Sequence, residues 1–230
     1  MINERIKELY ESNRHLFEGK PIAFDGIVNE EIYLSSKTKV TFLLKEINDP
    51  NMKSDWTDYM DWLNKGAPDQ KTGNLYKTWP NVCLWIELLK NPTCSYKDCL
   101  NSNLSFDESS LKNNLKNIAI VNLKKTGGGG SSNWEELREA TLKCKDFIVS
   151  ELKEIPSDIV ICGGTFDFAK MLFPLESKNQ HILPSGATYF LVDNTVYLDF
   201  VHPMWYSVNR NILFAYAKEV FNDLFNLELI

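Results

Sequence analysis

The sequence predicts an α/β protein: a three-layer α/β/α sandwich around a central, mostly parallel sheet of about four strands. Short, continuously apolar β-rich runs alternate with amphipathic helical segments along the chain. Runs of this kind are typical of parallel strands that are buried on both faces. The 230 residues fit one α/β domain, 1–230, in which we find no internal repeat and no linker that would split it.

The first half of the chain is expected to begin with an N-terminal helix-and-loop segment, 1–38, that contains a helix over 2–16. A strand over 39–46 (KVTFLLKE) should follow, then an insert over 51–77 with a short helix and a loop, and then helices over 78–90 and 106–115. The periodic spacing of apolar residues indicates the first helix. Thr78 can cap the helix that follows the insert, and Pro80 suits its first turn.

The second half is expected to contain, in order, a strand over 117–123 (NIAIVNL), a glycine-rich loop over 124–132 (KKTGGGGSS), a helix over 133–151, a strand over 157–162 (SDIVIC), a helix over 165–172, a hairpin and last strand within 189–201, and a helix over about 208–227. The hairpin should turn at Asp193-Asn194, because these residue types favour tight turns.

Composition limits the class of protein. A formal net charge of −6 argues against a wholly basic nucleic-acid coat but leaves room for a local basic groove. No basic, apolar leader opens the chain, and no apolar run approaches the ~18 residues that cross a bilayer. The five cysteines form no CxxC pair, so neither a zinc ribbon nor an iron–sulfur cluster is indicated. We therefore expect a cytoplasmic monomer with reduced thiols, no membrane contact, no metal and no cofactor.

Candidate site residues lie at the carboxyl ends of the strands: the polar residues Glu46, Asn48, Asp49, Asn122 and His202, and the pair Gly163-Gly164. Carboxyl ends of parallel strands meet at one edge of an open sheet, where such folds build their sites. Pro203 holds His202 in an extended conformation there. Carboxylate, amide and imidazole together can activate water, read a polar heterocycle and stabilise an anion. The alternatives are a structural His202, a satisfied core amide at Asn122, and a Glu46 that only pairs with Lys45 or Lys125.

A second group of residues suits contacts to nucleic acid. Trp205 and Tyr206 can wedge into stacked bases, with Arg210 on a phosphate, although rings near strand ends are also commonly core. The glycine-rich loop is neither a Walker loop nor a dinucleotide fingerprint. Its glycines are expected to be flexible and exposed, and Lys124, Lys125, Ser131 and Ser132 beside them suit phosphate contacts.

The order of four segments resembles the uracil-DNA glycosylase superfamily over about residue 39 to the C-terminus. KVTFLLKEINDP is similar to the strand with the water-activating motif, and NIAIVNL to the strand whose terminal Asn reads the base. DIVICGGTFDFAKML and HPMWYSVNRNILFAYAKEVF are similar to the next strand–turn–helix and to the His-Pro segment whose loop wedges into the duplex. The resemblance implies that Asn122 hydrogen-bonds the base, with Gly164 beside it, and that His202 stabilises the departing base.

Two departures from that pattern affect the expected chemistry. Ile47-Asn48 replaces the Gly-Gln of the family, so Glu46, Asn48 and Asp49 all remain candidates for the water activator. Asn51 and Met52 stand where one branch of the family has a Tyr that excludes 5-substituted pyrimidines. The resemblance then implies a roomier pocket, which the insert 51–77 can line and in which Tyr76 or Trp79 can stack on the base.

The sequence thus predicts a monofunctional DNA glycosylase, a hydrolase that flips one nucleotide out of duplex DNA and cleaves its N-glycosidic bond with water. Uracil, a deaminated purine and a bulkier 5-substituted cytosine all remain open as the base. DNA repair and antiviral defence against phages with modified DNA are the natural settings. Two competing interpretations are a non-catalytic DNA- or nucleotide-sensing module on the same fold and a hydrolase of free nucleosides or nucleotides.

Overall fold

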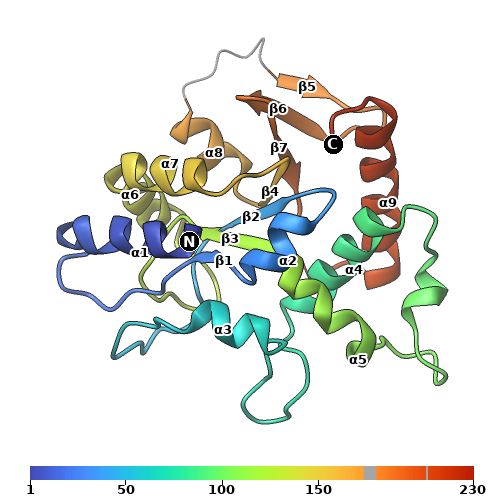
Figure 1. Ribbon diagram of the computed structural model, residues 1–230, viewed down its shortest axis with the longest axis horizontal. Coiled ribbons are helices and arrows are strands. Elements are labelled where there is room, and N and C mark those ends of the chain that lie inside the picture. Colours follow the sequence, from blue (N-terminus) through green and yellow to red (C-terminus); the bar gives the residue numbers. More distant parts are fainter. Residues whose placement is uncertain (174–179, 206) are drawn as a thin grey trace.

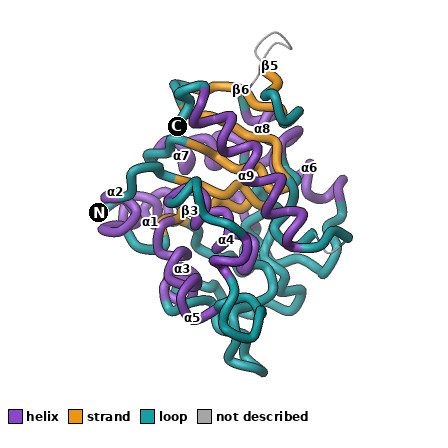
Figure 2. The backbone as a smooth tube through the Cα atoms, turned by 90° about the vertical axis from the view of Figure 1, so that its right-hand side faces the viewer, coloured by secondary structure: helices purple, strands orange, loops and turns teal. Residues whose placement is uncertain are grey.

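The computed structural model describes residues 1–173, 180–205 and 207–230. Within these residues, one mixed sheet of seven strands lies between helices, as Figures 1 and 2 show. The sheet has the strand order β1-β3-β2-β4-β7-β6-β5. The strands are β1 Gly26–Ile27, β2 Val40–Leu44, β3 Ile118–Asn122, β4 Ile159–Gly163, β5 Gln180–Ile182, β6 Thr188–Val192 and β7 Thr195–Phe200.

The centre of the sheet is parallel and its two margins are antiparallel. Strands β3, β2, β4 and β7 run parallel, whereas β1 pairs antiparallel with β3, and β6 and β5 extend the other margin antiparallel. The α/β class is confirmed, but a mostly parallel sheet of about four strands is not. The unpredicted strands β1 and β5 have two and three residues, too few for an apolar pattern.

Successive residues of the central strands point into two different hydrophobic clusters. Val40 and Phe42 of β2 belong to one cluster and Leu43 to the other, and Ile118 and Ala119 of β3 divide in the same way. This alternation follows from the two-residue period of a strand. The continuous apolar runs therefore do reflect burial on both faces.

Helices cover both clusters. α1, α6, α7 and α8 supply residues to the cluster on one face, and α3, α4, α5 and α9 to the cluster on the other. The helices of the described residues are α1 Ile2–Ser12, α2 Glu30–Ser35, α3 Tyr59–Asn64, α4 Trp79–Lys90, α5 Glu108–Leu111, α6 Trp134–Lys143, α7 Lys145–Glu154, α8 Phe166–Leu172 and α9 Arg210–Asn226, with 3₁₀ turns η1 Arg14–Phe17, η2 Tyr96–Cys99 and η3 Lys112–Asn117.

Several helix boundaries differ from the sequence prediction. The helix expected over 133–151 is two helices, α6 and α7, which meet at Cys144. The helix expected over 106–115 is the single turn α5 followed by η3, and α2 lies in the stretch expected to be loop. Thr78 occupies the N-cap of α4, but its side chain makes no capping hydrogen bond. Boundaries depend on local cap geometry, which apolar spacing does not encode.

The hairpin β6–β7 turns where expected. Asp193 and Asn194 have positive φ angles of 48° and 70°, which match the type I′ turns that favour these residues. The described helices include none that combines the length and apolar character needed to cross a bilayer.

Candidate functional site

A large cleft lies at the carboxyl ends of β2 and β3. It has a volume of about 1550 Å³ and is lined by segments 44–49 after β2, Asn122 of β3, loop residues 129–132, parts of the insert and of the start of α4, and His202. We call this hollow the cleft. Candidate residues that are as far apart in the sequence as Glu46 and Arg210 thus share one surface.

The segment after β2 holds three candidates in different environments. The Glu46 carboxylate is nearly enclosed and accepts a hydrogen bond from Lys124 Nζ at 2.8 Å, so its partner is neither Lys45 nor Lys125. Asn48 is exposed, whereas Asp49 is half-buried and its Oδ1 accepts the Asn51 N–H at 3.1 Å. Within the described residues, the second oxygen of Asp49 accepts no hydrogen bond.

The glycine-rich loop is only partly the open loop that was expected. Gly128 N donates to Ile47 O at 2.8 Å, and Gly127 and Gly128 pack so closely on this segment that a Cβ at either would lie about 2 Å from Asp49 O or from the Glu46 carboxylate. Glycine is therefore required at both positions, because the loop backbone lies too close to the segment after β2 for a side chain to fit. Gly129 and Gly130 are exposed and line the cleft.

Asn122 ends β3 and is only 2% exposed, yet it lines the cleft. Its Nδ2 donates to Asp25 Oδ1 at 2.7 Å, and its backbone N–H donates to Asp25 Oδ2 at 2.6 Å. The buried amide is thus partly hydrogen-bonded, as the alternative of a satisfied core amide anticipated. The same hydrogen bonds also hold the Asn122 side chain in place at the cleft. No local pattern in the sequence indicated Asp25 as its partner.

His202 follows β7 and lines the cleft beside Gly164. The Met204 N–H donates to His202 Nδ1 at 3.1 Å, so the proton of the neutral ring belongs on Nε2. Burial, assisted by the positive charge of Lys45, lowers the pKa of His202 to about 4. The imidazole is therefore neutral at physiological pH and can act as a hydrogen-bond donor through Nε2.

The positions of Gly163 at the end of β4 and of Gly164 after it favour glycine for different reasons, the first for lack of space and the second for its backbone conformation. A Cβ on Gly163 would lie 2.8 Å from Leu44 Cδ2, and one on Gly164, whose φ is +67°, would lie 3.7 Å from His202 Cβ. Gly164 was predicted to contact the substrate. It does not line the cleft but a neighbouring hollow of about 620 Å³.

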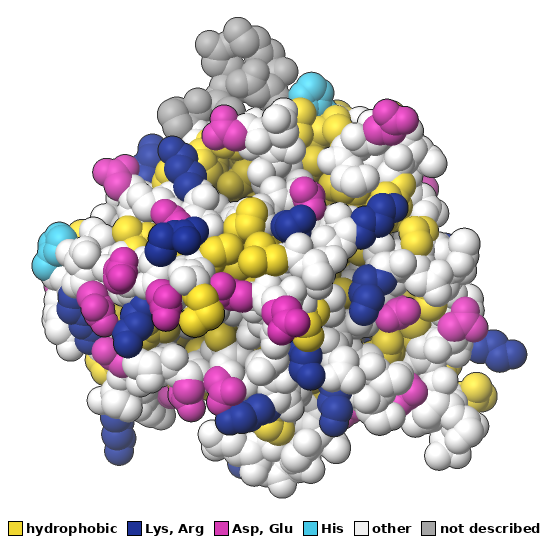
Figure 3. All heavy atoms as spheres, in the orientation of Figure 1, with side chains coloured by type: hydrophobic (Ala, Val, Ile, Leu, Met, Phe, Trp, Pro, Cys, Tyr) yellow, Lys and Arg dark blue, Asp and Glu magenta, His cyan; other side chains and the backbone are white. Residues whose placement is uncertain are grey.

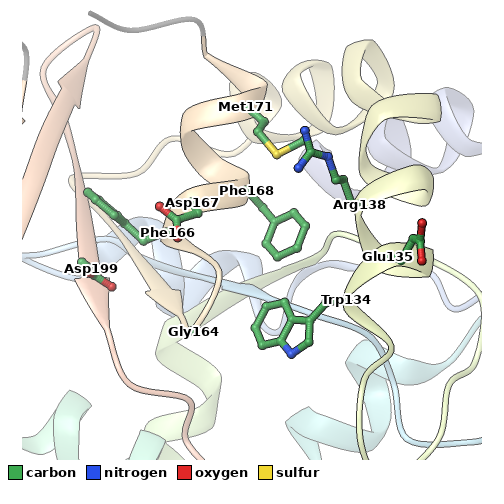
Figure 4. Close-up of a pocket in the computed structure, with 9 residues that line it drawn as sticks. All are labelled: Trp134, Glu135, Arg138, Gly164, Phe166, Asp167, Phe168, Met171 and Asp199. Atoms are coloured by element: carbon green, nitrogen blue, oxygen red, sulfur yellow. The ribbon is translucent and has the colours of Figure 1, made fainter. Parts of the chain in front are cut away.

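That neighbouring hollow is shown in Figure 4. Trp134 and Phe168 stack there with parallel rings 5.7 Å apart, and Asp167 and Asp199 lie on the other side of the hollow. Trp134 also lines the cleft, where Lys45 Nζ lies 4.3 Å from the centre of its ring. The two hollows therefore share a tryptophan wall.

Aromatic rings of the insert and of the start of α4 form part of the cleft wall. Trp56, Tyr59 and Trp62 contact one another, and Trp62 also contacts Tyr76 and Trp79. All five rings line the cleft, so the insert 51–77 does form a wall of it, as expected. Trp56, Tyr59 and Trp62 were not singled out in the sequence, because a Trp/Tyr-rich stretch does not reveal which rings face a hollow.

The two lysines expected on phosphates are engaged elsewhere. Lys125 is fully buried between Asp25 and Glu151, so the expectation that it contacts DNA is wrong: its ammonium has no access to solvent. Lys124 is 8% exposed and pairs with Glu46 and Glu136 at 2.8 and 2.6 Å, which leaves it little capacity for a phosphate.

The other expected DNA contacts remain at the surface. Ser131, Ser132 and Arg210 line the cleft, and Arg210 lies 4.9 Å from the centre of the Phe106 ring. Trp205 is 44% exposed, which does not fit a core residue. Tyr206 lies outside the described residues. Across the face in Figure 3, basic and acidic side chains are interspersed rather than segregated.

The described residues contain no cluster of three or more His, Cys, Asp or Glu side chains arranged to hold a metal ion. All five cysteines are buried and unpaired. No protein-family model matches the chain, and no curated protein sequence is significantly similar to it.

Proposed function

We propose that this chain is a monofunctional DNA glycosylase that removes a modified pyrimidine, uracil or a bulkier 5-substituted base, from DNA. The observation that carries the proposal is the meeting of Asp49, Asn122 and His202 at one cleft whose wall also contains aromatic rings. A hydrolytic glycosylase needs a water activator, a reader of the base edge and a donor to the departing base. The resemblance to the uracil-DNA glycosylase superfamily assigns these same roles.

Each residue has a defined part in the proposed reaction. Asp49, with one oxygen oriented by the Asn51 N–H, orients a water and accepts its proton, and the water oxygen bonds to C1′ as the C1′–N bond breaks. The electron pair of that bond leaves with the base. Neutral His202 donates a hydrogen bond from Nε2 to the resulting anion. Glu46, held by Lys124 beneath Gly128, fixes the loop and keeps a negative charge near the cationic sugar.

The aromatic side accepts the base. Trp79 lines the cleft and is 3% exposed, and within the described residues its buried indole Nε1 has no hydrogen-bond partner. Stacking of a base on an aromatic ring contributes roughly 1–3 kcal/mol. A cleft of this size has room for a 5-substituent that a tight uracil pocket excludes.

The decisive experiment is incubation of the protein with matched duplexes that contain uracil, 5-hydroxymethylcytosine or a glycosylated cytosine, scored for abasic sites. We expect base release, with the bulky base released at least as fast as uracil. A protein that leaves every base in place contradicts the proposal. Faster release of uracil would still identify a DNA glycosylase, but it would mean that the insert 51–77 does not determine which base is preferred.

A second candidate is hydrolysis of a free nucleoside or nucleotide, favoured by one observation: Lys124 and Lys125 are in ion pairs rather than at the surface. Salt distinguishes the two candidates. Each phosphate contact to duplex DNA should steepen the fall in affinity with salt, with a slope of about −0.9 per contact in a log–log plot. A nearly flat dependence on duplex DNA, together with cleavage of the free nucleoside, would favour the second candidate.

A further inference from the structure

We infer that Asp25 is a positioning residue that locks the amide of Asn122 in one orientation and so determines which base edge the cleft accepts. The inference deepens the proposed function and rests on it for the substrate. Its first part, the locked amide, is a property of the free protein and can be tested without any activity.

Asp25 reaches Asn122 through the strand register. Gly26 of β1 is paired antiparallel with Ile120 of β3, which brings the residue before β1 beside the end of β3. Both Asp25 oxygens are then used on one residue, with 2.7 Å to Asn122 Nδ2 and 2.6 Å to Asn122 N. The two side chains are buried, with exposures of 4% and 2%.

A carboxylate accepts hydrogen bonds and donates none, so the amide has only one favourable orientation. Nδ2 must point to Asp25, because a flipped amide would place Oδ1 against the carboxylate and lose a buried charge-assisted hydrogen bond. Tyr59 also lines the cleft, and burial together with the charge of Asp25 raises the pKa of its phenol well above the usual value. Asn122 is therefore held by Asp25 through both its backbone N–H and its side-chain amide.

A locked amide presents its remaining hydrogen and lone pair to the cleft in a fixed order. Uracil offers a carbonyl and an N–H along its pairing edge, and cytosine offers an amine and a bare nitrogen, which is the opposite order. An amide that cannot turn over fits one edge and leaves polar groups unpaired against the other, which can discriminate by up to ~10⁴–10⁵-fold. An amide that can turn over accepts both edges.

The surrounding charges make a conservative test possible. Lys125 Nζ contacts both Asp25 and Glu151, and Tyr10 Oη donates to Glu151 at 3.0 Å, so two buried carboxylates share one ammonium. Burial raises the pKa of Glu151 and the charge of Asp25 raises it further, whereas Lys125 opposes the shift. Asp25→Asn leaves one carboxylate with one lysine and keeps the shape of the side chain. Glu151→Gln changes the same charge cluster without touching Asn122, and is the matched control.

The first measurement is the side-chain NH₂ signal of Asn122 in ¹⁵N-labelled protein, assigned by its disappearance in Asn122→Ala. We expect one strongly hydrogen-bonded, slowly exchanging proton in the wild type and in Glu151→Gln, and its loss in Asp25→Asn. An unprotected signal in the wild type, or equal protection in Asp25→Asn, would overturn the locked amide.

The second measurement is single-turnover release of uracil and of 5-hydroxymethylcytosine from matched duplexes. Asp25→Asn should bring the ratio of the two rates at least ~10-fold closer to one, whereas Glu151→Gln should preserve it. An unchanged ratio in Asp25→Asn, or the same loss in Glu151→Gln, would overturn the role in specificity. A wild type that releases neither base from DNA contradicts the proposed function and the substrate part of the inference together, and leaves the NMR result to decide the locked amide.

Discussion

The two sides of the cleft are built by different means. On the sheet side, each polar group is held by a directional bond: Asp49 by Asn51 N–H, Asn122 by Asp25 and His202 by Met204 N–H. On the insert side, aromatic rings such as Trp62 are held by contact with one another. Directional bonds fix atoms to within tenths of an ångström, whereas apolar contact is non-directional and allows repacking. We infer that the sheet side sets the rate and the base edge that is accepted, and that the insert side sets how large a base fits.

The strongest test of this contrast is the choice between the two carboxylates after β2. Asp49→Asn should lower base release by roughly 10²–10⁴-fold, the usual contribution of a general base, with little change in melting temperature. Glu46→Gln should lower the melting temperature, because it leaves Lys124 short of a buried partner, and should slow release less. Single-turnover rates and thermal melts of both variants test this choice. The reverse pattern would make Glu46 the residue that activates the water.

The next largest effect on base release is expected from removal of the His202 imidazole. His202→Ala should lower base release by roughly 10²–10³-fold, the typical loss of one donor to a developing anion, without loss of fold. Since burial lowers the pKa of His202 to about 4, the ring loses its proton as pH rises through that value and stays neutral above it. Base release should therefore show no histidine-dependent limb between about pH 5 and 8. A limb near pH 6.5 that disappears in His202→Ala would contradict a neutral imidazole.

The insert side should alter preference more than rate. Tyr76→Ala enlarges the cleft beside the base and should shift the ratio of bulky-base to uracil release by ~10- to 200-fold at most, the range for a change in pocket size. Tyr96→Ala is the matched control, a half-buried tyrosine that packs on Phe214 outside the cleft. Equal shifts in both variants would mean that the effect is one of stability.

The smallest expected effect is that of the exposed ring after the His-Pro pair. Trp205→Ala should slow release a few-fold on duplex DNA and leave single-stranded DNA unaffected, because only a duplex requires a base stack to be opened, at a cost of a few kcal/mol. The single-stranded substrate is the internal control. Equal losses on both substrates would mean that Trp205 helps to position His202 instead. The backbone N–H of Trp205 donates a hydrogen bond to the His202 carbonyl at 3.0 Å.

The neighbouring lysines show the limit of local sequence reasoning. Lys124 and Lys125 look alike beside a glycine-rich loop, and both were expected to contact phosphates. Lys124 instead pairs with Glu46 and Glu136, and Lys125 is buried between Asp25 and Glu151. Asp25 is 100 positions from Lys125, and no local pattern specifies a partner at that distance.

Local sequence patterns were sufficient to predict the α/β class, the central strands and the carboxyl-end positions of Asp49, Asn122 and His202, because apolar runs, turns and prolines act through neighbouring residues. Which side chains meet depends on the folded arrangement of the whole chain. It joined β1 to β3 so that Asp25 reaches Asn122, folded Gly128 onto Glu46, and turned the rings of the insert toward the sheet edge. These pairings depend on strand order and register, which arise from packing of the whole chain rather than from local sequence pattern.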